Sequence, residues 1–192
     1  MAHADIMPGQ SVLDLGSGGG IDVFAASKKV GGAGRVVGVD ATFEMVLRAR
    51  ETAKDEGYSN VEFRLGEIEH LPVDSGSVDV VISNCVLNLV PDKARAFSEI
   101  QRVLKPGGRL VVSDIVARDE VTPEVKGDLE KWSECLSGAM TEEEIRRRSK
   151  NAGLADFRVL EASEWQDMGA GVPLRSLTFR TDKPSAATPG SS

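Results

Sequence analysis

The fold of this chain is decided by the stretch Ser11-Val-Leu-Asp-Leu15, which runs directly into Gly16-Ser-Gly-Gly-Gly20. The first five residues form a short, mainly apolar run that is typical of a buried strand. The glycines that follow let the backbone pass close to a ligand, and free N–H groups at the start of a helix favour an anion. We therefore predict a strand, a glycine-rich turn and a helix in that order, with ligand binding at the turn and a purely structural turn as the alternative.

Strands and helices continue to alternate as far as residue 115, which is typical of βαβ units around a parallel sheet. The expected strands are Ser11–Leu15, Arg35–Asp40, Val61–Leu65, Val78–Asn84 and Gly108–Ile115, and the expected helices are Gly19–Lys29, Thr42–Glu56 and Asp92–Leu104. The third helix is expected to end at the breaker Lys105-Pro-Gly-Gly108. The pattern predicts an α/β fold with a mostly parallel central sheet and helices on both faces.

The pattern changes after residue 115. The elements expected there are two helices and two strands: Glu124–Ala139, Thr141–Ala152, Phe157–Ala162 and Leu174–Thr181. Thr141 and Glu144 form a capping box for the second of these helices. The final segment is rich in Pro, Ser, Ala and Gly, so we predict a single domain over residues 1–182 and a disordered tail over residues 183–192.

The composition is that of one soluble domain. The chain has 192 residues, a hydrophobic fraction of 41% and a formal charge of −7 from 23 Lys and Arg against 30 Asp and Glu. A sequence pI near 5.0 argues against a nucleic-acid-binding face, which needs clustered basic residues. No apolar run approaches the roughly 18 residues of a membrane span, and Met1–Pro8 lacks the basic and apolar regions of a signal peptide. We expect a cytoplasmic protein that binds neither nucleic acid nor membrane.

The glycine-rich turn favours a ligand that contains adenosine. A dinucleotide fingerprint needs the pattern GxGxxG, but counting from Gly16 the third glycine position is held by Ile21. With Asp14 two positions before Gly16, the sequence instead reads acidic-x-GxGxG. This pattern resembles the cofactor loop of class I S-adenosylmethionine-dependent methyltransferases.

Two later segments strengthen this interpretation. Asp40 ends the second expected strand, 22 residues after Gly18, where a carboxylate can accept hydrogen bonds from both hydroxyls of a ribose. Its alternative role is a helix cap before Thr42. The segment Gly66-Glu-Ile-Glu-His-Leu-Pro72 follows the third expected strand, where methyltransferases hold the edge of the adenine. A carboxylate there can accept from the exocyclic amine while a backbone N–H donates to the ring.

Both cysteines stand in distinctive motifs. The sequence Ser83-Asn-Cys-Val-Leu-Asn-Leu-Val-Pro-Asp-Lys93 follows the fourth expected strand, so Asn84 and Cys85 are expected in the ligand crevice beside the reactive methyl group. Cys135 lies in Trp132–Met140, near the end of the next expected helix. Core packing is the alternative for each thiol, because free cysteine behaves as a small hydrophobe. Their spacing of 50 residues gives neither a disulfide framework nor a CxxC metal site.

Together these motifs are similar to those of arsenite S-adenosylmethionine methyltransferases, over a range from about Gly9 to Phe157. The resemblance implies a Rossmann-like class I methyltransferase fold, S-adenosylmethionine as the cofactor, and trivalent arsenic bound by Cys85 and Cys135 as the catalytic pair. The cofactor-binding residues that it implies are Asp14, Gly16, Ser17, Gly18, Asp40, Ala41, Thr42, Gly66, Glu67, Ile68 and Asn84. The family pattern also has cysteines upstream of the glycine-rich loop, and this chain has none there.

The chemistry of arsenic agrees with the resemblance. Trivalent arsenic is thiophilic and keeps a lone pair when three sulfurs bind it, so the lone pair can attack a sulfonium methyl group without a general base. Catalysis is then mainly positioning by the thiolates. Because the chain has two cysteines, we expect glutathione or another small thiol to supply the third sulfur ligand.

Two other functions remain open at this point. A small-molecule carbon or oxygen methyltransferase of the quinone-biosynthesis type would share the cofactor motifs, but it gives no reason for the two cysteine motifs. A non-catalytic domain that binds S-adenosylmethionine or arsenic would keep both sets of motifs without turnover.

Overall fold

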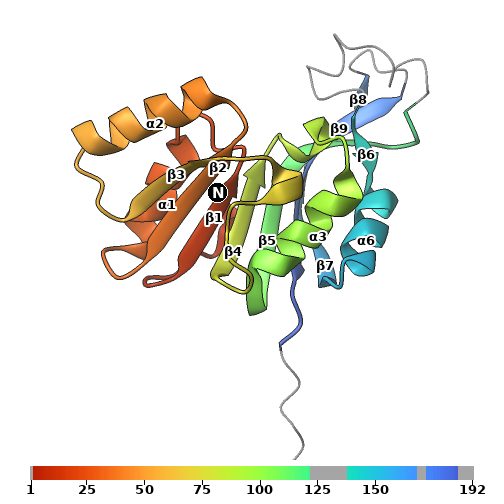
Figure 1. Cartoon of the computed structure of the whole chain (residues 1–192). Helices are drawn as coiled ribbons and strands as arrows, with labels where there is room; N and C mark the ends of the chain where they lie inside the picture. Colours follow the sequence, from red (N-terminus) through yellow and green to blue (C-terminus); the bar gives the residue numbers. More distant parts are fainter. Residues whose placement is uncertain (1, 122–137, 168–171, 186–192) are drawn as a thin grey trace, which may run out of the picture.

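The computed structural model describes residues 2–121, 138–167 and 172–185. Within these ranges the chain forms a nine-stranded sheet whose main path runs in the order β3-β2-β1-β4-β5-β9-β7 (Figure 1). The parallel strands are β1 (Ser11–Leu15), β2 (Arg35–Asp40), β3 (Val61–Leu65), β4 (Val78–Asn84) and β5 (Leu104–Ala117). The later strands are β6 (Met140–Thr141), β7 (Ala155–Ala162), β8 (Gln166–Asp167) and β9 (Pro173–Asp182).

The mostly parallel sheet is therefore confirmed, and its antiparallel part is confined to one side. The strand β9 runs antiparallel between β5 and β7. The short strand β6 extends β5 in a parallel pair, and β8 pairs antiparallel with β9.

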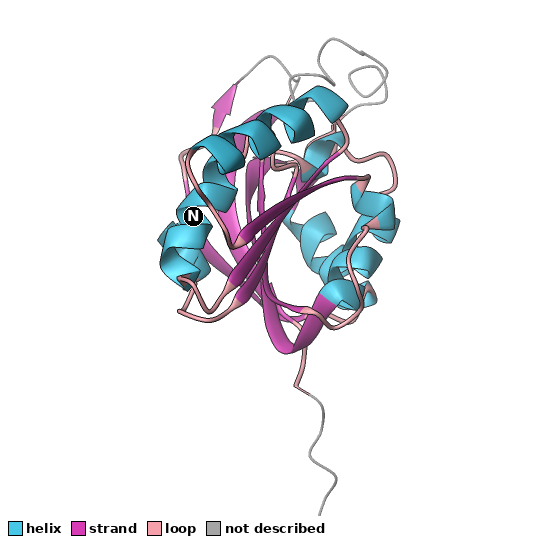
Figure 2. Ribbon diagram, turned by 60° about the vertical axis from the view of Figure 1, so that its left-hand side comes forward, coloured by secondary structure: helices cyan, strands magenta, loops and turns pink. Residues whose placement is uncertain are grey.

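Helices cover both faces of the sheet, as the sequence predicted (Figure 2). The helices are α1 (Ile21–Val30), α2 (Phe43–Asp55), α3 (Lys93–Val103) and α6 (Glu142–Asn151), with 3-10 turns η1 (Ala2–Ala4), η2 (Ile68–His70) and η3 (Leu87–Leu89). Neighbouring strand residues point to opposite faces. Val12 and Val80 therefore pack with residues of α1 and α2, whereas Leu13 and Val81 pack with residues of α3 and α6.

The first four strands match their predicted bounds, but β5 begins earlier than expected. Leu104 was expected to end a helix, and it instead pairs with Val78 as the first residue of the strand. The register then shifts before Arg109 pairs with Val80. Gly107 has a φ of 79°, so the predicted breaker bends the strand without ending it.

One predicted helix end is confirmed and another is wrong. The hydroxyl of Thr141 accepts a hydrogen bond from the N–H of Glu144 at 3.1 Å, which confirms half of the capping box. The predicted helix Glu124–Ala139 falls mostly outside the described residues. Its last two residues, Gly138 and Ala139, are described and are not helical, so that end of the prediction was wrong.

The C-terminal strands lie within two residues of their predicted starts and one residue of their predicted ends. The structure describes residues 183–185, which the prediction placed in the tail, and Lys183 exchanges backbone hydrogen bonds with Gly107 and Gly108. Its Nζ also donates to the carbonyls of Gln101 and Leu104. Across the described ranges, no helix has the length and apolarity that a membrane crossing requires.

Candidate active site

A pocket of about 450 Å³ opens at the carboxyl ends of β1, β2 and β3. Its lining contains predicted cofactor residues from three separate segments together with the residues that follow Cys85. The lining residues are Gly16, Val39, Asp40, Ala41, Thr42, Gly66, Glu67, Ile68, Glu69, Val86, Leu89, Val90 and Pro91. Of the eleven predicted cofactor residues, the pocket thus brings together Gly16, Asp40, Ala41, Thr42, Gly66, Glu67 and Ile68.

Gly16 is required at the pocket floor for two reasons. Its φ of 64° lies in the left-handed region that favours glycine. A Cβ at this position would also lie 2.6 Å from Cγ2 of Val86. The glycine therefore lets the chain turn after β1 while the segment after β4 packs directly on its backbone.

Asp40 joins the glycine-rich loop to the start of α2. Its Oδ2 accepts a hydrogen bond from the N–H of Gly18 at 2.8 Å, and its Oδ1 accepts from the N–H of Thr42 at 2.9 Å. The contact with Thr42 is the capping contact that was the alternative interpretation of this residue. Each carboxylate oxygen keeps a second lone pair, so the cap and a ligand contact are compatible.

Asp14 and Ser17 are buried and do not line the pocket. The Asp14 side chain is only 2% exposed, and burial raises its pKa well above the usual carboxyl range, with the nearby charges of Asp22 and Asp40 adding to the rise. The N–H of Ser17 donates to the carbonyl of Val39, and its buried Oγ has no hydrogen-bond partner among the described residues. These two residues are therefore part of the buried structure of the loop and not of the pocket surface.

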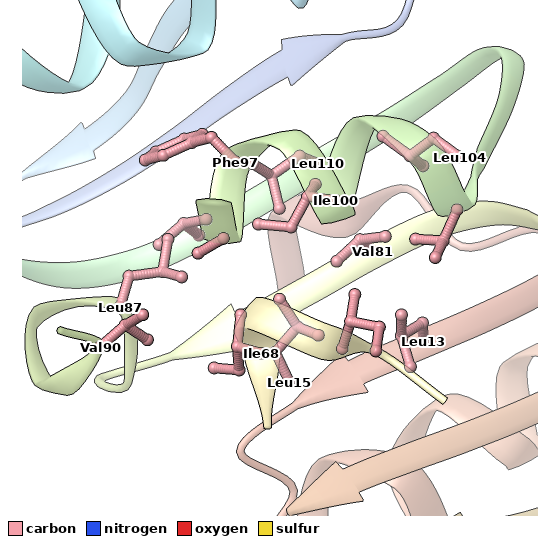
Figure 3. Close-up of a cluster of buried hydrophobic side chains, with 14 of the residues drawn as sticks. Leu13, Leu15, Ile68, Val81, Leu87, Val90, Phe97, Ile100, Leu104 and Leu110 are labelled. Atoms are coloured by element: carbon pink, nitrogen blue, oxygen red, sulfur yellow. The ribbon is translucent and has the colours of Figure 1, made fainter. Parts of the chain in front are cut away.

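The segment after β3 forms the opposite wall. The N–H of Gly66 donates to the carbonyl of Asp40 at 3.0 Å, which ties this wall to the end of β2. Ile68 is buried in the same cluster as Leu15, Leu87 and Val90 (Figure 3). Glu67 is exposed and its side chain is available at the pocket.

Cys85 is not among the lining residues, but it directly precedes Val86, which is one of them. Cys85 is an exposed residue with a φ of 53°, a left-handed conformation that a non-glycine residue seldom adopts. Its N–H donates to the carbonyl of Ser113 on β5 at 2.9 Å. Partial burial of the thiol and the nearby charge of Asp114 raise the pKa of Cys85 above its usual value, so the thiol is protonated at neutral pH.

One of the predicted cofactor residues stands apart from the pocket. Asn84 is exposed and lines a separate cavity of about 20 Å³ together with Asp22 and Ser113. Cys135 lies outside the described residues, so its distance from Cys85 stays a matter of prediction.

The fold and the pocket agree with comparisons to known proteins. A family model described as a methyltransferase domain matches residues 6–153. The chain belongs to this methyltransferase domain family.

Relatives of this methyltransferase domain confirm the resemblance that the cysteine motifs indicated. The chain is 43% identical to an arsenite methyltransferase of Halobacterium salinarum, with 96% of this chain and 49% of that protein covered. It is 36% identical to the arsenite methyltransferase of Homo sapiens, with 93% and 52% covered. The chain thus spans about half the length of the curated relatives it matches.

A solved structure of an arsenic(III) S-adenosylmethionine methyltransferase from Chlamydomonas reinhardtii has the same fold. It is 36% identical to this methyltransferase domain, with a TM-score of 0.84, and the match covers 95% of this chain and 65% of that one. The Rossmann-like class I methyltransferase fold is therefore confirmed.

Sequence reasoning missed one wall of the pocket and the polar residues behind it. Val86, Leu89, Val90 and Pro91 stand in the Cys85 motif, which was assigned to the substrate. The motif follows the end of a strand, and this position could have indicated that it contacts the cofactor as well as the substrate. The buried pair of Asn88 and Asp114 could not be predicted, because its members are 26 residues apart and only Asn88 stands in one of the motifs.

Proposed function

We propose that this domain moves the methyl group of S-adenosylmethionine onto thiol-bound trivalent arsenic, as a step in arsenic detoxification. The observation that carries the proposal is the adjacency of Cys85 to Val86, which forms part of the wall of the pocket built from the predicted cofactor residues. A thiol at this edge can hold an arsenic atom next to a methyl group presented from the pocket. The names and the 36–43% identity of the arsenite methyltransferase relatives support the assignment.

The pocket fits an adenosine cofactor in size and in chemistry. Its volume of about 450 Å³ lies in the range of small-molecule sites, about 300–1,000 Å³. Asp40 keeps lone pairs for the ribose hydroxyls, and Glu67 offers a carboxylate to the exocyclic amine of adenine. Gly16 lines the pocket without a side chain, so its backbone can lie close to a ligand. When bound, S-adenosylmethionine supplies an electrophilic methyl group on a sulfonium.

In this proposal Cys85 and Cys135 supply two sulfur ligands to arsenic. Each thiol that replaces an oxygen ligand on arsenite gives up its proton, and that oxygen leaves as water. A raised thiol pKa therefore leaves Cys85 protonated until arsenic binds. With the cofactor bound, the two cysteines would hold the arsenic lone pair in line with the sulfonium methyl group, so that the As–C bond would form as the S–C bond breaks and S-adenosylhomocysteine leaves. The residues position the two partners, and no general base is needed.

We propose that glutathione or another small thiol completes the coordination, because the chain contains two cysteines. A reducing compartment such as the cytoplasm would keep both protein thiols and the small thiol available for arsenic.

The assignment is tested by incubating the protein with S-adenosylmethionine labelled in the methyl group, arsenite and glutathione, and by separating the arsenic species. Labelled methylated arsenic is expected, and its yield is expected to fall when glutathione is omitted. A parallel incubation with a quinone precursor replaces arsenite. Label in the quinone and none in arsenic would contradict the proposal in favour of a carbon methyltransferase, and label in neither would favour a binding domain.

A further inference from the structure

The segment from Cys85 to Pro91 is held by buried polar groups that a simple turn does not need. Asn88 is 1% exposed and Asp114, on β5, is 4% exposed. Burial of a carboxylate and an amide is costly unless both are hydrogen-bonded. An apolar side chain would fill the same space at lower cost, so this pair is expected to have a specific role.

Asn88 and Asp114 connect the segment to the central sheet. The Nδ2 of Asn88 donates to Oδ1 of Asp114 at 2.9 Å and to the carbonyl of Ile115 at 2.7 Å. The N–H of Ile115 donates to the same Oδ1 at 2.8 Å. Both N–H donors of the Asn88 amide are thus used, and both of their acceptors lie on β5.

Lys93 binds the segment from the other side, at the start of α3. Its Nζ donates to the carbonyl of Asn88 at 3.2 Å and to the carbonyl of Val90 at 3.0 Å. These carbonyls belong to the η3 turn and to the residue after it, so the ammonium group satisfies acceptors that the short turn leaves open.

At the start of the segment the backbone of Cys85 is fixed in a conformation of low intrinsic stability. Its left-handed φ of 53° persists only when the surroundings impose it. The bond from its N–H to Ser113 and the packing of Val86 on Gly16 supply part of that constraint. The hydrogen bonds of Asn88, three residues further along, add to it.

We propose that Asn88, Asp114 and Lys93 are positioning residues that fix the backbone of Cys85–Pro91 and thereby hold the Cys85 sulfur at the wall of the cofactor pocket. This proposal rests on the proposed function, because it assigns these residues to the geometry of the same methyl transfer. None of the three touches the cofactor pocket itself, so their effect reaches the reaction through the segment.

The first test measures Cys85 directly. The chain has two cysteines, so the Cys135→Ser variant has Cys85 as its sole thiol. The second-order rate constant of this thiol with a chromogenic disulfide reagent is measured at one pH, before and after adding Asn88→Ala or Lys93→Met. We expect each change to raise the rate constant about fivefold, because a released segment moves the thiol away from the partly buried position beside Asp114 that raises its pKa.

A matched control separates positioning from general loss of stability. Asn60 is another asparagine whose side-chain amide donates two hydrogen bonds. Its Nδ2 donates to the carbonyls of Ser27 and Gly31, and its Oδ1 accepts from the hydroxyl of Ser27. It directly precedes β3, an outer strand of the sheet, whereas Cys85 directly follows β4 in the middle of the sheet. Asn60→Ala is expected to lower the melting temperature as Asn88→Ala does, yet to leave the Cys85 rate constant within about twofold of its parent.

The second test uses the protein with both cysteines. Asn88→Ala and Lys93→Met are expected to lower kcat for arsenite methylation about tenfold while the Kd for S-adenosylmethionine stays within about twofold. Unchanged thiol rates and unchanged kcat in a folded Lys93→Met variant would overturn the proposal, even if Asn88→Ala does not fold. Absence of arsenic methylation in the unmodified protein would instead remove the proposed function, and the thiol rates would still show whether the segment is held as described.

Discussion

A Cβ on Gly16 would lie 2.6 Å from Cγ2 of Val86, so the loop after β1 and the segment that carries Cys85 are in direct contact. Gly16 therefore both lines the cofactor pocket and contacts the residue that follows the predicted arsenic ligand Cys85. A change at Gly16 is therefore expected to disturb both, whereas a change at Gly18 or Gly19, where a Cβ meets nothing within 4 Å, is not.

We predict that Gly16→Ala lowers the free energy of unfolding by about 2–4 kcal/mol, because it combines left-handed strain with a steric clash. Gly18→Ala is the matched control, because Gly18 also has a positive φ, 49°, but a Cβ there meets nothing within 4 Å. It is expected to cost about 1 kcal/mol. Adding Val86→Ala should recover part of the loss in Gly16→Ala. Equal losses for the two glycine variants in urea denaturation would contradict the clash.

We predict that Asp40→Ala weakens S-adenosylmethionine binding by about 1.5–3 kcal/mol, the usual cost of losing hydrogen bonds to a charged group. The carboxylate supports Gly18 and Thr42 as well as the ribose, so the variant loses both the contact and the loop geometry. Calorimetric titration measures the affinity, with Asp55→Ala at the exposed end of α2 as the control. NAD is expected to bind weakly. Comparable NAD binding, or an unchanged affinity in Asp40→Ala, would be incompatible with the cofactor assignment.

We predict that Cys85→Ser and Cys135→Ser each abolish methylation of arsenite and of monomethylarsonous acid while leaving cofactor affinity unchanged. A serine hydroxyl is a poor ligand for thiophilic arsenic, and positioning is lost when either sulfur is removed. Product analysis with both substrates checks this. Normal methylation of both substrates by either variant would show that the replaced cysteine only packs.

We predict that Asp114 makes the protein less stable as the pH rises. Burial raises the pKa of Asp114 to about 6, although hydrogen bonds from the amides of Ile115, Asn88 and Leu87 and the charge of Lys93 lower it. An unfolded aspartate titrates near pH 3.9, so the folded protein binds this proton more tightly. The stabilisation is complete below about pH 4 and is lost as the pH rises through about 6.

The measurement compares the unfolding free energies of the unmodified protein and Asp114→Asn between pH 4 and pH 8. Their difference is expected to change by about 2–3 kcal/mol in favour of the variant as the pH rises. The comparison is needed because other groups change the stability with the opposite dependence on pH. Arg64 and Arg102 donate hydrogen bonds to Glu62 and Glu99 and lower their pKa values, so these two carboxylates stabilise the protein more as the pH rises. A difference that stays constant with pH would contradict the prediction.

We predict that the end of the ordered domain lies at or after Lys183. Deletion of residues 186–192 is expected to leave the melting temperature unchanged. Deletion of residues 183–192 also removes the four hydrogen bonds of Lys183 and is expected to lower the melting temperature by about 4 °C or more. Thermal unfolding followed by circular dichroism distinguishes the two. Identical melting temperatures would place the boundary before Lys183.

The sequence predicted those parts of the molecule whose signals are local. The bounds of β1 to β4 follow from short apolar runs that end at polar or glycine residues, and Asp40 and Gly66 fall at strand ends for that reason. The two-residue strands β6 and β8 were not predicted, because two residues show no periodicity. Leu104 was assigned to a helix because its pairing partner, Val78, is distant in the sequence. The contact between Gly16 and Val86 could not be predicted either, since it depends on how two loops pack.

The position of β9 has a consequence for the order in which the chain can fold during synthesis. In the described part of the chain, β7 reaches the sheet only through β9, which follows it in sequence and pairs Asp182 with Arg109 on β5. A ribosome therefore delivers β1 to β5 and β7 before the strand that joins β7 to them. Until β9 has emerged, β5 has an open edge, which is a site for wrong pairing with other chains. Pairing on this side of the molecule must therefore wait until β9, which ends at Asp182, has left the ribosome.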